Sequence, residues 1–176
     1  LFTQTGIFTG ALMRQIMDSE IQRLPASKSI DVGNKIDVDE VDFLAYAAAD
    51  PGTKVIGLYI EGIANLPEFT NQARKLRGHK PIVMLKPGRT AMGKLASAFH
   101  TGSAPSDDAA VQAGLRDTGI LRVEDEDDFI NTLRALVMLP KPKGRRVGIA
   151  TTSGALGVIA SDLIDDYGLE LATFES

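Results

Sequence analysis

The chain of 176 residues contains no cysteine and only two histidines. The absence of cysteine excludes disulfides, thiol catalysis and cysteine-ligated metal sites. The two histidines, His79 and His100, lie far apart in the sequence. This separation disfavours a histidine-based metal centre, and we expect no metal site in this segment.

Basic residues are not in excess, because 19 lysines and arginines stand against 23 aspartates and glutamates, giving a net charge of -4. No basic stripe favours nucleic acid or an anionic membrane as a partner. No apolar run approaches the roughly 20 residues of a membrane span, and no signal peptide is visible. We therefore expect a cytoplasmic protein. Because Leu1 stands inside an expected strand, we interpret the chain as a piece of a longer polypeptide.

What the sequence does contain is a regular alternation of short apolar runs and amphipathic segments. Residues 55–60 and 82–85 are apolar nearly throughout, which is typical of strands buried on both faces of a parallel sheet. Between them, Phe69 and Leu76 share one face of a predicted helix. The alternation predicts an α/β fold with a doubly wound parallel sheet in residues 1–139. Its functional crevice should lie beyond the carboxyl ends of the strands.

Local signals predict how some of these segments begin and what they carry. The spacing Asp37-x-x-Glu40 predicts a capping box at the start of a helix. Residues 86–102 are punctuated by glycine, and we predict that residues 98–103 form a loop that presents His100 among small residues. An imidazole in such a loop can act as ligand, base or nucleophile, with a structural or solvated histidine as the ordinary alternative.

A second start follows the first unit. Residues 140–146 have the composition of a linker, and residues 147–176 begin again with a predicted strand at 147–150, a turn, a helix and a second strand at 169–174. The turn Thr151-Thr152-Ser153-Gly154 repeats the pattern of Thr3-Gln4-Thr5-Gly6, so an internal repeat of one fold is the economical interpretation. Too few residues remain for a complete second sheet. We expect a partial second domain of similar fold, truncated or completed by another chain.

Each of these two turns places a hydroxyl beside a glycine at the start of a helix, at Thr5-Gly6 and at Ser153-Gly154. The backbone N–H groups there, with a helix dipole equivalent to about +0.5 charge, attract anions such as phosphate. The alternative is that threonine or serine simply caps the helix while glycine makes the turn. Neither turn is a Walker A loop, because no Gly-Lys-Ser/Thr follows.

Charged residues stand at the ends of two predicted strands. Glu61 ends one of them, where it can hydrogen-bond an imidazole nitrogen and fix its tautomer. Lys86 and Arg89 follow the other and are candidate anion-binding residues. For all three, solvation at the surface is the alternative. His79 follows a helix, and we predict that it interacts with the last carbonyls of that helix.

Seven short motifs follow one another along the chain. They are Thr3-Gln4-Thr5-Gly6, Ser29-x-x-Val32-Gly33-Asn34-x-x-Asp37-Val38-Asp39, Asp50-Pro51-x-Thr53, Tyr59-Ile60-Glu61-Gly62-Ile63, Lys80-Pro81, Leu85-Lys86-x-Gly88-Arg89-Thr90 and His100-Thr101-Gly102. In this order they resemble the NDP-forming acyl-CoA synthetases, a family that includes ADP-forming acetate–CoA ligase and is related to succinyl-CoA synthetase. Residues 151–155 with Asp162 resemble the start of the family's next domain. The resemblance implies a flavodoxin-like fold for both units.

The resemblance also implies a reaction and a site. Acyl-CoA, phosphate and ADP would be interconverted with carboxylic acid, CoA and ATP through a phosphohistidine at His100, whose ring Glu61 would orient. Further residues are implied to bind phosphate. They are Gln4, Thr5, Gly6, Gly33, Asn34, Thr101, Gly102, Ser153 and Gly154.

The complete enzyme implied by the resemblance needs partners that this segment lacks, namely a CoA-binding and an ATP-grasp domain or subunit. We expect no cofactor on this segment, and CoA, ATP or ADP and Mg²⁺ in the complete, oligomeric enzyme, acting on a small carboxylic acid. Two alternatives stay open. One is a non-catalytic regulatory or scaffold module of the same fold. The other is a flavodoxin-type FMN-binding protein, which the lack of tryptophan and the presence of only three tyrosines disfavour.

Overall fold

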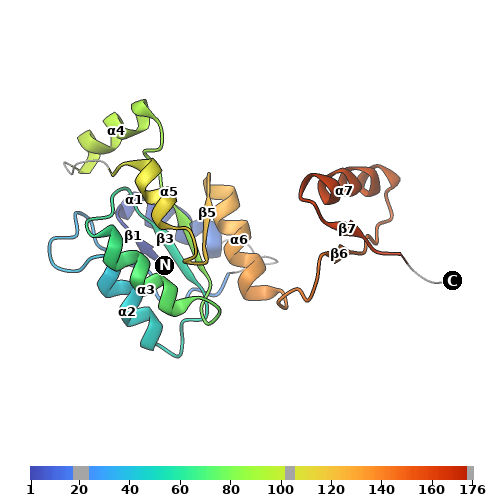
Figure 1. Cartoon of the computed structure of the whole chain (residues 1–176), viewed down its shortest axis with the longest axis horizontal. Coiled ribbons are helices and arrows are strands. Elements are labelled where there is room, and N and C mark those ends of the chain that lie inside the picture. Colours follow the sequence, from blue (N-terminus) through green and yellow to red (C-terminus); the bar gives the residue numbers. More distant parts are fainter. Residues whose placement is uncertain (18–23, 102–105, 174–176) are drawn as a thin grey trace. The chain divides into compact units, whose positions relative to one another are not determined.

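Strands and helices alternate along the computed structural model, except that α4 and α5 follow one another, and the model describes residues 1–17, 24–101 and 106–173 (Figure 1). The strands are β1 (Phe2–Thr3), β2 (Ile30–Asp31), β3 (Ile56–Tyr59), β4 (Ile82–Leu85), β5 (Ile120–Val123), β6 (Arg146–Val147) and β7 (Glu170–Leu171). The helices are α1 (Gly6–Met17), α2 (Glu40–Ala49), α3 (Leu66–Leu76), α4 (Ala91–Thr101), α5 (Asp108–Gly114), α6 (Glu126–Met138) and α7 (Gly154–Asp166). The chain divides into two compact units, Leu1–Leu139 and Pro140–Ser176, and each is described by itself.

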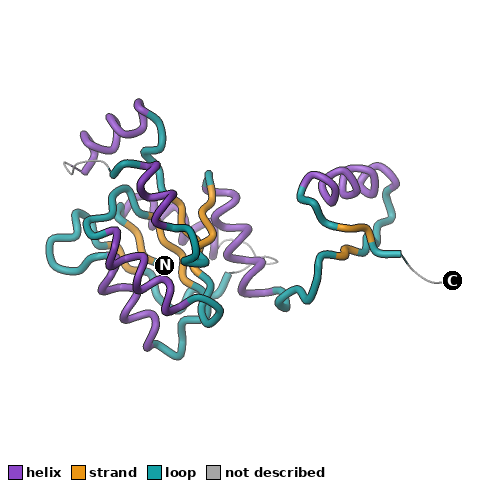
Figure 2. Tube along the Cα trace, in the orientation of Figure 1, coloured by secondary structure: helices purple, strands orange, loops and turns teal. Residues whose placement is uncertain are grey.

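The first unit is built on a five-stranded parallel sheet in the order β2-β1-β3-β4-β5. The strands β3 and β4 pair over their full length, with Ile56 opposite Ile82 and Tyr59 opposite Leu85. Helices lie on both sides of this sheet (Figure 2). The predicted doubly wound α/β fold is therefore confirmed. The strand order is that of flavodoxin-like sheets, in which the winding reverses between β1 and β3.

Successive residues of the central strands contribute to two different hydrophobic cores. On β4, Ile82 and Met84 belong to one core, and Val83 and Leu85 belong to the other. The first core includes residues of α2, α3 and α5, and the second includes residues of α1 and α6. Because both faces of the strands are covered, the strands are apolar throughout, which is the pattern that identified them in the sequence.

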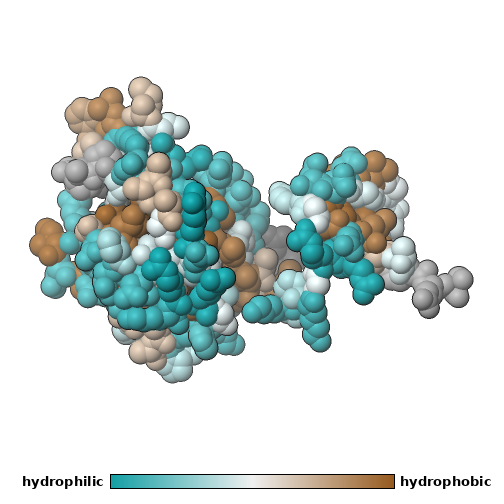
Figure 3. All heavy atoms as spheres, in the orientation of Figure 1, coloured by the Kyte–Doolittle hydropathy of each residue, from teal (hydrophilic) through white to brown (hydrophobic). Residues whose placement is uncertain are grey.

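The predicted loop at residues 98–103 is wrong for residues 98–101, because residues 91–101 form α4, and residues 102 and 103 lie outside the described residues. Alanine, leucine, methionine and lysine predominate there and favour a helix, while Gly93 allows the backbone to come close to Gly88. A Cβ atom at Gly93 would lie 3.2 Å from Gly88 Cα. The apolar side chains Met92, Leu95 and Phe99 of α4 are exposed, and the helix contributes an apolar patch to the surface (Figure 3).

The predicted capping box at Asp37 and Glu40 is also wrong. The N-cap of α2 is Asp39, whose Oδ1 accepts hydrogen bonds from Val41 N and Asp42 N, and Asp42 Oδ2 accepts from Asp39 N in return. Asp42 stands three residues after Asp39 and thus satisfies the reciprocal geometry of a capping box. Glu40 therefore does not cap the helix, and its side chain is fully buried.

In the second unit, β6 and β7 form a two-stranded parallel ladder, with Val147 opposite Leu171. Both strands are shorter than the predicted runs 147–150 and 169–174, because each finds a hydrogen-bonded partner over two residues only. Residue 174, the last of the second run, lies outside the described residues. Across the described part of both units, no helix combines the length and apolar character needed to cross a membrane.

Candidate active site

The ends of β1 and β3 meet at the carboxyl edge of the sheet, at the point where the strand order reverses. Ligands of open α/β sheets bind at such a switch point. Gln4 and Glu61 stand there, and each side chain is almost completely buried. The Oε1 atom of Gln4 accepts hydrogen bonds from Glu61 N at 2.6 Å and from Gly62 N at 3.2 Å. Gln4 thereby fixes the backbone that carries Glu61.

The next two amides of this loop are held in the same way. Ile63 N donates to Ser106 Oγ at 3.0 Å, and Ala64 N donates to Glu40 Oε1 at 2.9 Å. Each N–H group from Glu61 to Ala64 therefore donates to a side chain from another part of the fold. Such a loop has little freedom to move, because buried donors are costly to leave unpaired.

The imidazole of His100 lies against the carboxylate of Glu61. The Nδ1 atom is 3.0 Å from Glu61 Oε1 and 3.2 Å from Oε2. The side chain of His100 is 55% exposed, whereas that of Glu61 is 5% exposed. Because Nδ1 donates its proton to the carboxylate, Nε2 keeps a lone pair and can attack an electrophile. The carboxylate also stabilises positive charge that develops on the ring.

Two further side chains hold the Glu61 carboxylate. Ser97 Oγ donates to Oε2 at 3.1 Å, and Tyr59 OH donates to Oε1 at 3.4 Å. Burial and the charge of Glu61 raise the pKa of Tyr59 to about 12, so the phenol stays a donor at neutral pH. Ser97 and His100 are three residues apart in α4 and therefore share one face of that helix. The buried carboxylate is thus held by donors from both β3 and α4.

Lys86 follows β4 and is not a solvated surface cation, since only 1% of it is exposed. Its ammonium donates to the carbonyl oxygen of Pro87 at 3.2 Å. Burial lowers the pKa of Lys86, and the nearby carboxylates of Asp108 and Glu61 oppose that shift. Arg89 is exposed at the surface and forms an ion pair with Glu124 at 3.1 Å. Anion binding by either residue stays a prediction.

Two glycine-containing turns follow the neighbouring strands β1 and β2. Thr5 immediately precedes α1, and Gly6 is the first residue of that helix. A Cβ atom at Gly6 would lie 2.8 Å from Asp31 Oδ2, so any other residue there would force the Asp31 carboxylate to shift. Gly33 N donates to Asp31 Oδ1 at 3.0 Å, and Asn34 beside it is exposed. Phosphate binding at these turns stays a prediction.

The other predicted site residues are placed as follows. Thr101 is the last residue of α4, and Gly102 lies outside the described residues. Ser153 and Gly154 begin α7 in the second unit, where Ser153 makes no side-chain cap bond to the helix. His79 has its backbone N–H bonded to Leu76 O beyond the end of α3. The predicted imidazole contact with those carbonyls is not among the described bonds.

Sequence reasoning missed four residues around Glu61. They are Lys35, Glu40, Ser97 and Ser106. Ser97 could have been found, because a helix containing His100 puts the residue three positions earlier on the same face. The other three reach the Glu61 loop across 24 to 43 residues of sequence, and no local pattern marks such contacts.

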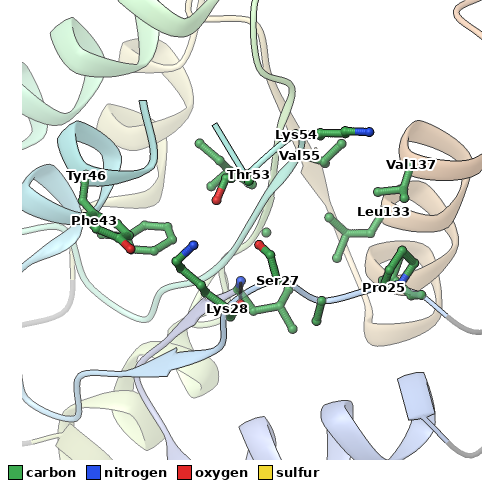
Figure 4. Close-up of a pocket in the computed structure, with 16 residues that line it drawn as sticks. Pro25, Ser27, Lys28, Phe43, Tyr46, Thr53, Lys54, Val55, Leu133 and Val137 are labelled. Atoms are coloured by element: carbon green, nitrogen blue, oxygen red, sulfur yellow. Dashed lines mark hydrogen bonds between the residues drawn. The ribbon is translucent and has the colours of Figure 1, made fainter. Parts of the chain in front are cut away.

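A separate cavity of about 430 Å³ lies at the opposite edge, near the amino ends of the strands. It opens between Phe43 and Tyr46 of α2 on one side and Leu133 and Val137 of α6 on the other (Figure 4). None of the predicted site residues lines it. Nor do residues 1–17, 24–101 and 106–173 contain three histidine, cysteine, aspartate or glutamate side chains grouped to hold a metal ion.

Known proteins resemble this chain over nearly its whole length. It is 36% identical over 168 residues to the ADP-forming acetate–CoA ligase of Methanocaldococcus jannaschii, covering 95% of this chain and 24% of the relative. It is 38% identical to the alpha subunit of the ADP-forming acetate–CoA ligase II of Pyrococcus furiosus, covering 95% and 36%. The chain thus spans between about a quarter and about a third of the length of these relatives.

A solved structure has the same fold. It is the dinucleotide-forming acetyl-coenzyme A synthetase 1 of Ca. Korarchaeum cryptofilum in complex with phosphate and ADP, with a TM-score of 0.88 and 34% identity over 99% of this chain and 37% of that one. The family model of the succinyl-CoA ligase like flavodoxin domain matches residues 1–136. That match covers the sheet, the Glu61 loop and His100, and the chain therefore belongs to the family of succinyl-CoA ligase like flavodoxin domains.

Proposed function

We propose that the chain is the phosphohistidine-bearing part of an ADP-forming acyl-CoA synthetase, with His100 as the catalytic residue. The observation that carries this proposal is the contact between His100 Nδ1 and the buried Glu61 carboxylate at 3.0 Å. The relatives named as ADP-forming acetate–CoA ligases support the class of reaction. The solved relative, which holds phosphate and ADP, supports phosphoryl chemistry on this fold.

In the proposed relay, Nε2 of His100 attacks the phosphorus atom of an acyl phosphate. The N–P bond forms, the bond from phosphorus to the acyl oxygen breaks, and the carboxylate leaves. The Nδ1 proton stays between the ring and Glu61, whose negative charge offsets the positive charge on the phosphorylated ring. A terminal phosphate oxygen of ADP then attacks, the N–P bond breaks, and ATP and neutral His100 are regenerated.

The remaining residues of the carboxyl edge have supporting roles in this proposal. The amides at Thr5-Gly6, with the dipole of α1, attract the phosphoryl oxygens. The buried ammonium of Lys86 adds positive charge near Glu61. Acyl-CoA formation, the nucleotide and Mg²⁺ belong to other domains or subunits of the complete enzyme, since this chain spans about a third or less of its relatives.

The test uses the complete enzyme and ATP labelled in its γ-phosphate. We expect acid-labile, alkali-stable label on this segment of the wild type and no label with His100→Ala. His79→Ala, which removes the other histidine of this segment, should label normally. Glu61→Gln should slow labelling by roughly 10²-fold, because it removes the charge behind the ring. An unlabelled wild type, or label retained by His100→Ala, would refute the proposal. The first result would favour a non-catalytic module.

A further inference from the structure

The loop that carries Glu61 is attached to a buried ion pair with no place in the relay itself. Lys35 Nζ is 2.7 Å from Glu40 Oε2, and the two side chains are 9% and 0% exposed. Lys35 Nζ also donates to the carbonyl oxygen of Gly62, and Glu40 Oε1 accepts from Ala64 N at 2.9 Å. The pair therefore holds two backbone groups of the loop after Glu61. The carbonyl oxygen of Gly62 accepts from Lys35, and the N–H group of Ala64 donates to Glu40.

The backbone at Lys35 is unusual and supports a specific role. Its φ of 56° lies in the left-handed region, which is unfavourable for a residue with a Cβ atom. The conformation is held by a turn in which Lys35 N donates to Val32 O at 3.0 Å. A glycine would relieve the strain but would have no ammonium to reach Gly62. Strain of this kind persists where the surrounding structure requires it, often at functional sites.

Stability alone does not account for such a pair. Burying two charges costs desolvation free energy, and replacing a buried ion pair by apolar side chains of similar volume is often neutral or stabilising. The pair instead fixes the position of the loop after β3, because its bonds connect that loop to the start of α2 and to the turn after β2. Together with Gln4, it leaves the Glu61 carboxylate a narrow range of positions at which to meet His100.

We propose that Lys35 and Glu40 are positioning residues that hold the Glu61 carboxylate on His100 Nδ1, so that Nε2 is the nitrogen presented for phosphoryl transfer. This inference rests on the proposed function, since it assigns a role in the same reaction. Among the described bonds, none joins Lys35 or Glu40 to His100. Both act through the backbone of residues 62–64 and then through Glu61.

The test is the double variant Lys35→Met/Glu40→Gln in the complete enzyme. It removes both charges together, keeps the length of each side chain, and retains an oxygen acceptor for Ala64 N. We expect labelling of His100 to slow by about 10-fold or more, as for other residues that orient a ligand or base. The fraction of His100 in the Nδ1–H tautomer, measured from ¹⁵N chemical shifts, should fall. Substrate KM should change little, because binding groups are untouched.

The matched control is Lys28→Met/Asp50→Asn, which removes an ion pair of 2.8 Å at the opposite edge of the sheet. It should alter stability without altering the labelling rate or the tautomer. A Lys35→Met/Glu40→Gln variant that labels at the wild-type rate with an unchanged tautomer would overturn the inference. Should it fail to fold, Glu40→Gln alone is judged by the same two readouts.

The two proposals fail in different ways. If the wild type takes no label, the relay is refuted, and the tautomer of His100 still reports whether the pair positions Glu61. If the wild type takes label and the double variant matches it in both readouts, only the positioning role is lost.

Discussion

At the amino edge of the sheet, polar side chains finish helix ends. Lys80 Nζ donates to the carbonyl oxygens of Ala47, Ala48 and Asp50, at 2.7, 3.0 and 2.7 Å, and so closes the end of α2. Asp50 in turn accepts from Lys28 at 2.8 Å. These bonds satisfy groups that every helix leaves open at its end, and they need no further purpose.

At the carboxyl edge, polar side chains are more deeply buried and converge on one carboxylate. Gln4 and Glu40 hold the backbone around Glu61, while Ser97 and His100 hold its oxygens. The hydrogen bonds of a helix end or a turn can be completed by fewer side chains than surround Glu61. The difference between the two edges separates polar contacts that complete the fold from polar contacts that prepare a site.

The largest expected effect on stability comes from Gln4→Ala. The variant leaves the N–H groups of Glu61 and Gly62 without their acceptor, which should lower the free energy of unfolding by about 2–4 kcal/mol, measured by urea denaturation. It should also slow labelling of His100 by about 10-fold or more per folded molecule, because Glu61 loses its placement.

Lys80→Met is the matched control at the amino edge. It removes three hydrogen bonds to carbonyls and should cost about 1–2 kcal/mol, with the labelling rate per folded molecule unchanged. Equal labelling defects in Gln4→Ala and Lys80→Met would erase the distinction between the edges.

A smaller effect, of opposite sign, is expected for Lys86→Met. Burial lowers the pKa of Lys86, so the charged amine destabilises the fold at neutral pH. Removing it should therefore raise the melting temperature, measured by thermal denaturation of the wild type and the variant. Labelling of His100 should nevertheless slow, because positive charge near Glu61 is lost. This combination of higher stability and lower activity is expected of a functional site.

The pH dependence of stability checks the same point about Lys86. With a folded-state pKa below the unfolded value of 10.5, the unfolded state binds more protons between those two values. The free energy of unfolding of the wild type should therefore rise with pH across that window, and the rise should be smaller in Lys86→Met. A variant that is less stable than the wild type at neutral pH would show that the ammonium stabilises the fold.

The central strands of the sheet could be predicted from the sequence, because burial on both faces requires a continuous apolar run in each strand. The apolar run Ile82–Leu85 coincides with β4, and the run 55–60 contains β3. Glu61 was identifiable because a carboxylate directly after such a run cannot enter the core unpaired. These are properties of single segments, and a single segment is what a sequence pattern describes.

What the sequence did not reveal depends on partners far along the chain. The spacing Asp37-x-x-Glu40 predicts a local capping role for Glu40, but its carboxylate accepts a hydrogen bond from Ala64 N, 24 residues away. Small residues around His100 indicate a loop at residues 98–103, but residues 98–101 belong to α4, whose sequence is rich in good helix formers. The matching turns before α1 and α7 differ as well, since Gly6 lies against Asp31 whereas a Cβ at Gly154 would meet nothing within 4 Å.

The smallest expected effect concerns the ion pair of the amino edge and its response to acid. Lys28, Thr53 and the amide of Gly52 hold the pKa of Asp50 at about 2, below its ordinary value of 3.8. A lowered carboxyl pKa stabilises the fold above pH 3.8, and this contribution is lost as the pH falls through about 2. Asp50→Asn should therefore be less stable than the wild type at neutral pH, and the difference should shrink in acid and in high salt.

Urea denaturation of the wild type and Asp50→Asn across that pH range measures the effect, and His100 labelling at neutral pH should be the same in both. A constant difference in stability at all pH values would mean that Asp50 contributes through its hydrogen bonds to Thr53 and Gly52 and not through its charge. A loss of labelling would be the more serious result. It would show that a change at the amino edge alters the reactivity of His100. The contacts of a polar group would then be insufficient to tell whether it only completes a helix end or also positions the imidazole.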